Sequence, residues 1–134
     1  MNRRFVAVVF GVLAAALCSC DENDVGVCPA VINPGVEVEV RDALTGLPAA
    51  SGAAGIVFDD SFSDSLRISG YAGDDALRMA AAWGRSGSYS VVIQKPGYRV
   101  WTDSHVVAAR GRCGVITARI KARLVSDTEP VPNR

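Results

Sequence analysis

The sequence predicts an all-β fold in which two antiparallel sheets pack face to face as a sandwich. Short apolar stretches are separated by turn signals at intervals of about 8 to 12 residues, and no stretch has the pattern of a long amphipathic helix. With 134 residues, of which 49% are hydrophobic, the chain has room for one small domain. Each sheet of such a domain hides its apolar face against the other.

The chain begins with an export signal. Arg3 and Arg4 precede an uncharged apolar run of roughly 13 residues, which suits a signal peptide and is shorter than the ~20 residues that span a bilayer. The run ends at Cys20, with Leu17 three places before it and Ser19 just before it. This arrangement resembles the lipobox of bacterial lipoproteins. An ordinary secretory signal, which would leave a soluble protein, is the alternative.

The lipobox resemblance implies cleavage before Cys20 and attachment of diacylglycerol to its sulfur. Since each buried methylene contributes ~0.8 kcal/mol, two or three acyl chains would hold the protein durably on a membrane. The expected location is a bacterial cell envelope, facing the periplasm or the exterior, with the choice between inner and outer membrane left open. Residues 1–19 are then the signal peptide and residues 20–30 a polar tether.

The charge of the mature chain excludes one class of partner. Loss of Arg3 and Arg4 lowers the basic count from 14 to 12 against 14 acids, which leaves a net charge of about −2. Such a chain has no electrostatic footprint for nucleic acid. We expect the membrane as one partner and an envelope protein or a glycan as the other.

The cysteines predict one disulfide bond. Cys18 leaves with the signal peptide and Cys20 is acylated, so Cys28 and Cys113 remain as a pair in an oxidising compartment. Their bond would close a loop of about 85 residues, worth roughly 4 to 5 kcal/mol in the chain-entropy model. A redox pair or a metal site is the alternative, but no C-x-x-C spacing occurs and His105 is the only histidine.

A hairpin over residues 87–101 is the centre of the predicted domain, which covers residues 31–125. Tyr89, Val91 and Ile93 fall on one face of its first strand, and Pro96 and Gly97 then favour a type II turn. The other predicted strands, in order, cover residues 36–41, 55–59, 66–69, 77–83, 103–109 and 114–125.

Two of these strands carry further predictions. Residues 77–83 also fit a single helical turn, and we favour a strand because the run is short and stops at a glycine. In the last strand one set of alternating side chains is apolar and is expected to face inward: Ile116, Ala118, Ile120, Ala122 and Leu124. Residues 126–134 are expected to form a frayed tail.

Three segments together resemble carboxypeptidase regulatory-like domains. They are residues 38–48, with Asp42 and Thr45-Gly46 before Pro48, residues 87–98, and residues 113–117. The resemblance implies a seven-stranded transthyretin-like sandwich that acts as an accessory module, with no cofactor and no catalytic residues. The chain departs from the pattern at Gly114, where some members carry histidine.

Three groups of side chains are candidate sites. Asp103, Ser104 and His105 have the residue types of a catalytic triad, but neighbours on a strand point to opposite faces, so we expect no catalysis. A candidate ligand platform consists of Trp83, Tyr98 and Trp101, for which core packing is the favoured alternative. Five loop carboxylates are candidate calcium ligands, although solvated acids are the favoured interpretation: Asp59, Asp60, Asp64, Asp74 and Asp75.

Overall fold

The computed structural model of this chain describes residues 26–70, 73 and 76–128. Signal peptide, lipobox and Cys20 lie outside the described residues, as do Asp74 and Asp75. The described residues form eight strands and no helix, which confirms the all-β class. Over the same residues, no helix is long and apolar enough to cross a membrane.

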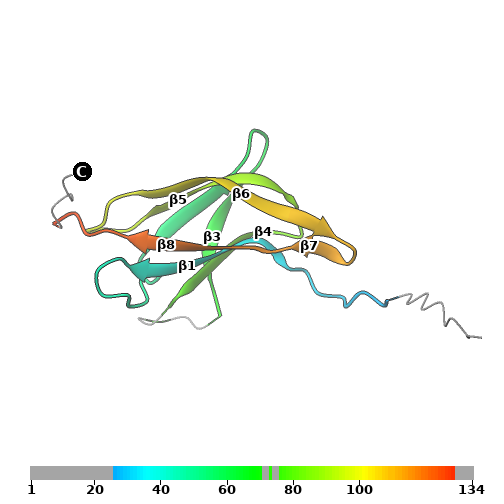
Figure 1. Ribbon diagram of the computed structural model, residues 1–134, viewed down its shortest axis with the longest axis horizontal. Coiled ribbons are helices and arrows are strands. Elements are labelled where there is room, and N and C mark those ends of the chain that lie inside the picture. Colours follow the sequence, from blue (N-terminus) through cyan, green and yellow to red (C-terminus); the bar gives the residue numbers. More distant parts are fainter. Residues whose placement is uncertain (1–25, 71–72, 74–75, 129–134) are drawn as a thin grey trace, which may run out of the picture.

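The strands follow one another without any helical connection (Figure 1). They are β1 (Pro34–Asp42), β2 (Ala54–Phe58), β3 (Ser63–Ser69), β4 (Arg78–Trp83), β5 (Gly87–Gln94), β6 (Trp101–Gly111), β7 (Gly114–Ile116) and β8 (Ala118–Leu124). The predicted count of seven is wrong, since residues 114–125 form two strands. The second strand of the predicted hairpin and the predicted strand over residues 103–109 are one continuous strand, β6. Residues 77–83 are strand β4, as the sequence favoured.

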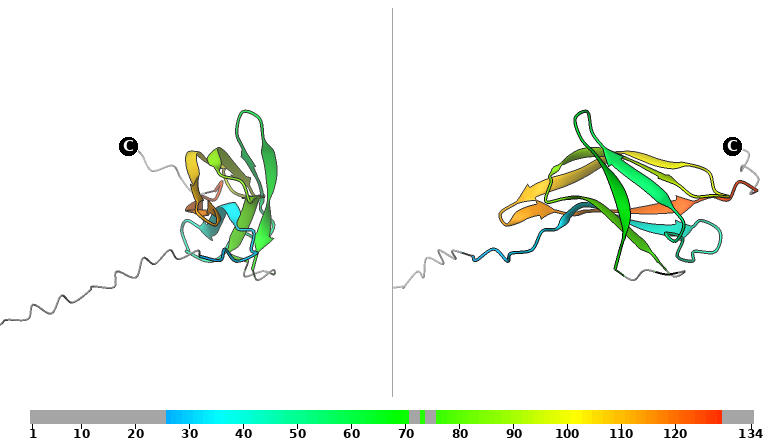
Figure 2. Two further views of the ribbon diagram at one scale, coloured as in Figure 1. Left: turned by 90° about the vertical axis from the view of Figure 1, so that its right-hand side faces the viewer. Right: turned by 180° about the vertical axis from the view of Figure 1, so that it is seen from behind.

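All eight strands belong to one mixed sheet, in the order β7-β6-β5-β2-β3-β4-β1-β8. Every neighbouring pair is antiparallel except β1 and β8, which run in the same direction, so the sheet is not wholly antiparallel as predicted. The two outermost strands, β7 and β8, are consecutive in the chain and separated only by Thr117. The sheet therefore curls on itself into a nearly closed barrel, with its strands around a common interior (Figure 2).

The two edges of the curled sheet approach each other at both ends of its long axis. At one end the chain passes from edge strand β7 through Thr117 directly into edge strand β8. At the other end backbone hydrogen bonds link the segment between β5 and β6 to the segment after β8: the Arg99 amide donates to the Val125 carbonyl at 2.9 Å and the Asp127 amide to the Gly97 carbonyl at 3.0 Å. Asp127, which the sequence assigned to the tail, is thus hydrogen-bonded to the turn after β5.

The interior is apolar. At its centre lie side chains that the alternating sequence pattern placed on one face of a predicted strand. Tyr89, Val91 and Ile93 of β5 are buried, as predicted, and face buried valines on β1 and β2. The turn after β5 is also confirmed, because Gly97 has φ 81° and the Tyr98 amide donates to the Lys95 carbonyl at 3.0 Å. The central hairpin thus has the predicted inward face and turn.

The alternation of the last strand fails at Thr117. Val115 is buried whereas Ile116 is 59% exposed, so the prediction that Ile116 faces inward is wrong. Beyond Thr117 the predicted set holds, since Ala122 and Leu124 are buried and Ala118 and Ile120 are partly buried. The break lies where the chain stops pairing with β6 and starts pairing with β1.

The two ends of the barrel are built differently. We define the tether end as residues 26–35, 83–87 and 109–118, and the Asp42 end as residues 42–48, 94–98 and 124–127. A disulfide joins Cys28 to Cys113 at the tether end, with a Cα–Cα distance of 5.1 Å, which confirms the predicted pair. Figure 1 shows residues 26–33 leaving the barrel beside the β6–β7 hairpin at this end.

Candidate functional site

One outer side of the barrel carries no Asp, Glu, Lys or Arg. This neutral face covers the outward positions of β2 and β5 together with neighbouring positions on β3 and β6. Arg67 marks its border with β4, since Arg67 pairs with Ala80. The neutral face consists of Ala54, Ile56, Phe58, Ser63, Ser65, Ser88, Ser90, Val92, Gln94, Thr102, Ser104, His105 and Val107.

Strand register places an apolar centre inside a border of hydroxyl groups. Ile56 lies opposite Ser65 on β3 and opposite Val92 on β5, and Val92 in turn lies opposite Thr102 on β6. Ile56 and Phe58, two positions apart on the same face of β2, are 38% and 37% exposed, so the apolar side chains form a patch and are not one isolated exposed residue. A shallow hollow of about 220 Å³ lies over this centre, lined by Ile56, Val92 and neighbouring parts of β2 and β5.

A β-bulge brings Ser104 and His105 to the same side of β6. Between the pairs Tyr89–Val106 and Val91–Asp103, β6 has one residue more than β5. Both side chains are therefore exposed on the neutral face, and Ser104 Oγ lies 3.0 Å from His105 Nδ1. The prediction that strand geometry keeps these two side chains apart is wrong, because it assumed an unbroken alternation.

This contact does not have the geometry of a catalytic triad. Asp103 Oδ1 accepts a hydrogen bond from the backbone amide of His105 at 3.2 Å, so its carboxylate holds the bulge. In a triad the carboxylate holds the ring of the histidine. The bulge thus presents a hydroxyl and an imidazole outward as a polar pair.

The side of the barrel formed by β4, β1 and β8 has the opposite character. Glu37 faces Arg119 across the parallel pair, and Glu39 faces Lys121 in the same way. A hollow of about 350 Å³ lies between these side chains. The resulting charged face has five cations and two carboxylates: Arg41, Arg78, Arg119, Lys121, Arg123, Glu37 and Glu39.

The structure does not bring the three predicted platform residues together. Trp83 lies opposite Pro34 at the tether end, whereas Tyr98 bonds to Asp42 at the other end of β1. Trp83 is 54% exposed, so core packing, the favoured expectation, is wrong for it. Trp101 and Tyr98 are partly buried and pack against the core, as expected.

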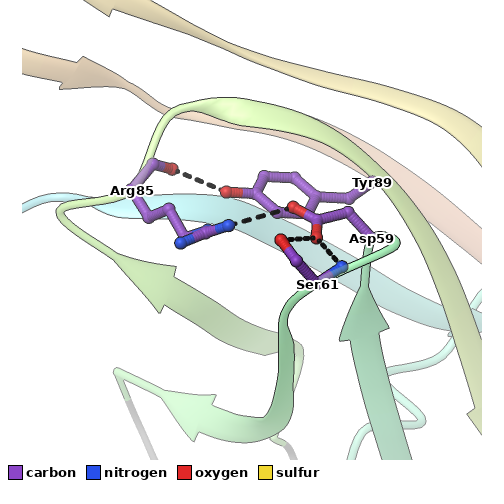
Figure 3. A network of polar contacts seen from close by, with 4 residues as sticks. All are labelled: Asp59, Ser61, Arg85 and Tyr89. Atoms are coloured by element: carbon purple, nitrogen blue, oxygen red, sulfur yellow. Dashed lines mark hydrogen bonds and ion pairs between the residues drawn. The ribbon is translucent and has the colours of Figure 1, made fainter.

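Two of the three described loop acids, Asp59 and Asp64, bond to the protein itself, whereas no such bond to a described residue is seen for Asp60. Asp59 accepts hydrogen bonds from Ser61 and an ion pair from Arg85, whose backbone carbonyl in turn accepts from the hydroxyl of buried Tyr89 (Figure 3). These bonds to Ser61 and Arg85 hold the pKa of Asp59 below its ordinary value. Asp64 accepts from the amide of Ala82 at 2.8 Å. Among the described residues, no three His, Cys, Asp or Glu side chains gather to hold a metal ion.

Asp42 organises the end of the barrel that has no disulfide. Its Oδ1 accepts from the amides of Leu44 and Thr45 at 2.9 and 2.7 Å, and its Oδ2 accepts from the Tyr98 hydroxyl at 2.8 Å. The bond from Thr45, followed by that from Tyr98, lowers the pKa of Asp42. The hydrogen bond from the Tyr98 hydroxyl to Asp42, followed by partial burial, raises the pKa of Tyr98.

The sequence reasoning missed the neutral face, although a signal for it exists. Residues 54, 56 and 58 and residues 88, 90, 92 and 94 contain no charged side chain at the outward positions of two predicted strands. We considered each strand separately, and the face emerges only once β2 is known to lie beside β5. A comparison of the sequence with protein-family models finds no match, and a search of curated proteins finds no significant relative.

Proposed function

We propose that this chain is an envelope lipoprotein whose barrel is a non-catalytic module that binds a protein partner through the neutral face. The anchor in this proposal is the acylated Cys20. The observation that supports binding is the uncharged outer face, where Ile56, Phe58 and Val92 lie together on a rigid sheet. A solvated sheet face ordinarily carries charged residues, as β1 and β8 do here.

The composition of the neutral face fits a protein interface. Charged residues are depleted at the core of such interfaces, and aromatic and aliphatic side chains fill it inside a polar rim. Here Phe58 and Ile56 supply the apolar centre, and seven Ser, Thr and Gln side chains surround it. The Ser104–His105 pair adds a fixed donor and acceptor at one edge.

A relationship to carboxypeptidase regulatory-like domains is part of this proposal. The residues that carry the resemblance have clear structural roles, since Asp42 and Thr45 form a hydrogen-bonded turn and Gly97 adopts the positive φ of the hairpin turn. Such domains are accessory modules, which agrees with a binding role.

The anchor is tested by Cys20→Ser in the full chain. We expect the variant to lose palmitate labelling and to leave the membrane fraction, while Cys18→Ser keeps both. Labelling and membrane fractionation that persist in Cys20→Ser would reject the anchor.

The binding face is tested by photo-crosslinking in intact cells. A photoreactive residue at Phe58 should capture one protein, and the same residue at Lys121 on the charged face serves as the matched control. Ile56→Asp places a charge in the apolar centre and should abolish capture at Phe58 without unfolding the barrel, because Ile56 points outward. Equal capture at the two positions, or capture that Ile56→Asp leaves unchanged, contradicts the protein-binding role.

A neutral glycan is the second candidate ligand, because Phe58 lies between hydroxyl side chains, Ser63 on β3 and Ser90 on β5, and the amide of Gln94 lies on the same face opposite Ala54. Two further variants separate the two candidates. Binding of the full chain to purified cell-wall glycan should then fall in both Phe58→Ala and Gln94→Ala. That result, together with no protein captured by the photoreactive residue, would favour the glycan.

A further inference from the structure

The tether end of the barrel combines exposed apolar side chains with arginines. Trp83 and Ile116 are 54% and 59% exposed, and three apolar residues of the segment that enters β1 are also exposed, namely Val27, Val31 and Ile32. The three segments of this end contain three arginines and no carboxylate: Arg85, Arg110 and Arg112. Asp59 pairs with Arg85 from the β2–β3 loop.

Several contacts place these side chains at one end of the molecule. Trp83 pairs with Pro34, and the amide of the next residue, Gly84, donates to the Asn33 carbonyl at 2.9 Å. The disulfide fixes Cys28, and with it Val27, to the β6–β7 hairpin, which carries Arg110 near the end of β6 and Arg112 in the turn. A hollow of about 170 Å³ separates this turn from the β4–β5 turn.

This end is also the one nearest to the proposed lipid anchor. Cys28 lies eight positions after Cys20 in the sequence, and at full extension this length of chain spans at most about 29 Å. The Asp42 end lies farther away by the length of β6, whose 11 residues span roughly 35 Å. A barrel held by Cys20 therefore meets the bilayer with its tether end first.

We infer that the tether end rests on the bilayer surface, with Trp83, Ile32 and Ile116 among the headgroups and Arg110 and Arg112 beside the phosphates of anionic lipids. The inference rests on the proposed anchor at Cys20. Tryptophan favours the membrane interface because one part of its ring is apolar and its N–H is polar. Arginine adds an electrostatic attraction to anionic headgroups, and an acyl chain with a basic patch binds more firmly than either alone.

The tether itself offers a competing partner for the arginines. Asp21, Glu22 and Asp24 follow Cys20 directly, and their carboxylates could pair with Arg110 and Arg112 in place of lipid phosphates. In that case the barrel end would respond neither to the lipid charge nor to loss of the two arginines.

The experiment uses the acylated full-length protein, reconstituted in vesicles of phosphatidylcholine with or without phosphatidylglycerol. Brominated acyl chains quench tryptophan only near the bilayer. The chain has two tryptophans, Trp83 and Trp101, and only Trp83 lies at the tether end. We expect brominated lipid to quench the wild type, and expect Trp83→Phe to lose most of that quenching, since Trp101 is too far away.

The arginines are tested in the same assay with a matched pair of double variants. Arg110→Gln with Arg112→Gln should reduce quenching several-fold in phosphatidylglycerol vesicles, whereas Lys121→Gln with Arg123→Gln on the charged face should leave it unchanged. A protein that does not sediment with the vesicles has no anchor, which overturns the proposed anchor itself. A protein that sediments but shows no quenching of Trp83, or equal quenching in the arginine variant, keeps its anchor and overturns the inference.

Discussion

The two ends of the barrel hold their connecting segments in place by different chemistry. At the tether end a covalent bond between Cys28 and Cys113 holds the entering segment against the last hairpin. At the Asp42 end a single carboxylate accepts from Leu44, Thr45 and Tyr98, so hydrogen bonds hold the loops. The disulfide does not depend on solvent or on the charge of nearby groups. The hydrogen bonds at the Asp42 end depend on the ionised state of the Asp42 carboxylate.

The two ends of the barrel also differ in the reason why each contains a glycine. Gly35 at the tether end has no room for a side chain, since a Cβ there would lie 2.5 Å from the Arg85 carbonyl oxygen and 2.8 Å from that of Ala82. Gly97 at the Asp42 end has open space around it, but its φ is +81°. Each end therefore needs its glycine for a different reason.

The largest effect should come from Gly35→Ala. Its methyl group meets two backbone oxygens, that of Ala82 in β4 and that of Arg85 in the β4–β5 turn, so the backbone has to move, and we expect a loss of about 3 kcal/mol in the free energy of unfolding. Gly97→Ala, which meets no atom, should cost about 1 kcal/mol for its left-handed conformation alone. Urea denaturation at pH 7 measures both, and a larger loss for Gly97→Ala would contradict the assignment of the two causes.

Alternation along the chain was sufficient to predict most strands but not how they assemble. Val36 to Arg41 and Tyr89 to Ile93 alternate so regularly that only one face of each can be buried. Nothing local states that β8 lies parallel to β1, because that pairing joins residues about 82 positions apart, as Glu37 and Arg119 are. The closed barrel follows from that pairing and was therefore not predicted.

Alternation does not decide which side chain faces inward where two neighbouring residues are both apolar. Val106 and Val107 are adjacent, so either could point inward, and the bulge at Ser104 and His105 decides for Val106. Val115 and Ile116 present the same choice, and the turn from Gly111 to Gly114 decides for Val115. The candidate face was missed for a related reason, since its members come from four strands whose order the sequence does not state.

Removal of the disulfide should have the next largest effect. The unfolded chain loses the closure of an 85-residue loop, worth roughly 4 to 5 kcal/mol. The folded chain gains freedom as well, because residues 29–33 are exposed and closing this short segment costs about 2 kcal/mol in the same model. We therefore expect Cys28→Ser with Cys113→Ser to lower the free energy of unfolding by about 2 kcal/mol.

Urea denaturation of this double variant, and of the wild type with and without reductant, measures the effect. The reduced wild type should match the variant, and reductant should leave the variant unchanged. A loss near the full loop value would mean that residues 26–33 pack against the barrel without the bond, and the tether end would then depend less on covalent chemistry than the comparison states.

The smallest effect should come from removing the hydroxyl groups of two tyrosines. The pH dependence of this effect should differ between the two ends of the barrel. Tyr98→Phe removes a hydrogen bond to a carboxylate at the Asp42 end, and Tyr89→Phe removes one to the Arg85 carbonyl at the tether end. Each should cost about 1 kcal/mol at pH 7. Far-ultraviolet circular dichroism during urea denaturation, repeated between about pH 3 and pH 11, gives the difference from wild type for each variant.

The sign of the pH dependence follows from the two shifted groups. Because the folded-state pKa of Asp42 is lowered, its contribution is complete above its ordinary pKa of 3.8 and is lost as the pH falls through the lowered value. The pKa of Tyr98 is raised, so its contribution is complete below its ordinary pKa of 10.0 and is lost as the pH rises through the raised value. The Tyr98→Phe difference should therefore shrink in both acid and alkali. The Tyr89→Phe difference should shrink only in alkali, because burial raises the pKa of Tyr89 and its acceptor is a carbonyl that does not titrate. Identical profiles for the two variants would show that Asp42 does not control its end of the barrel.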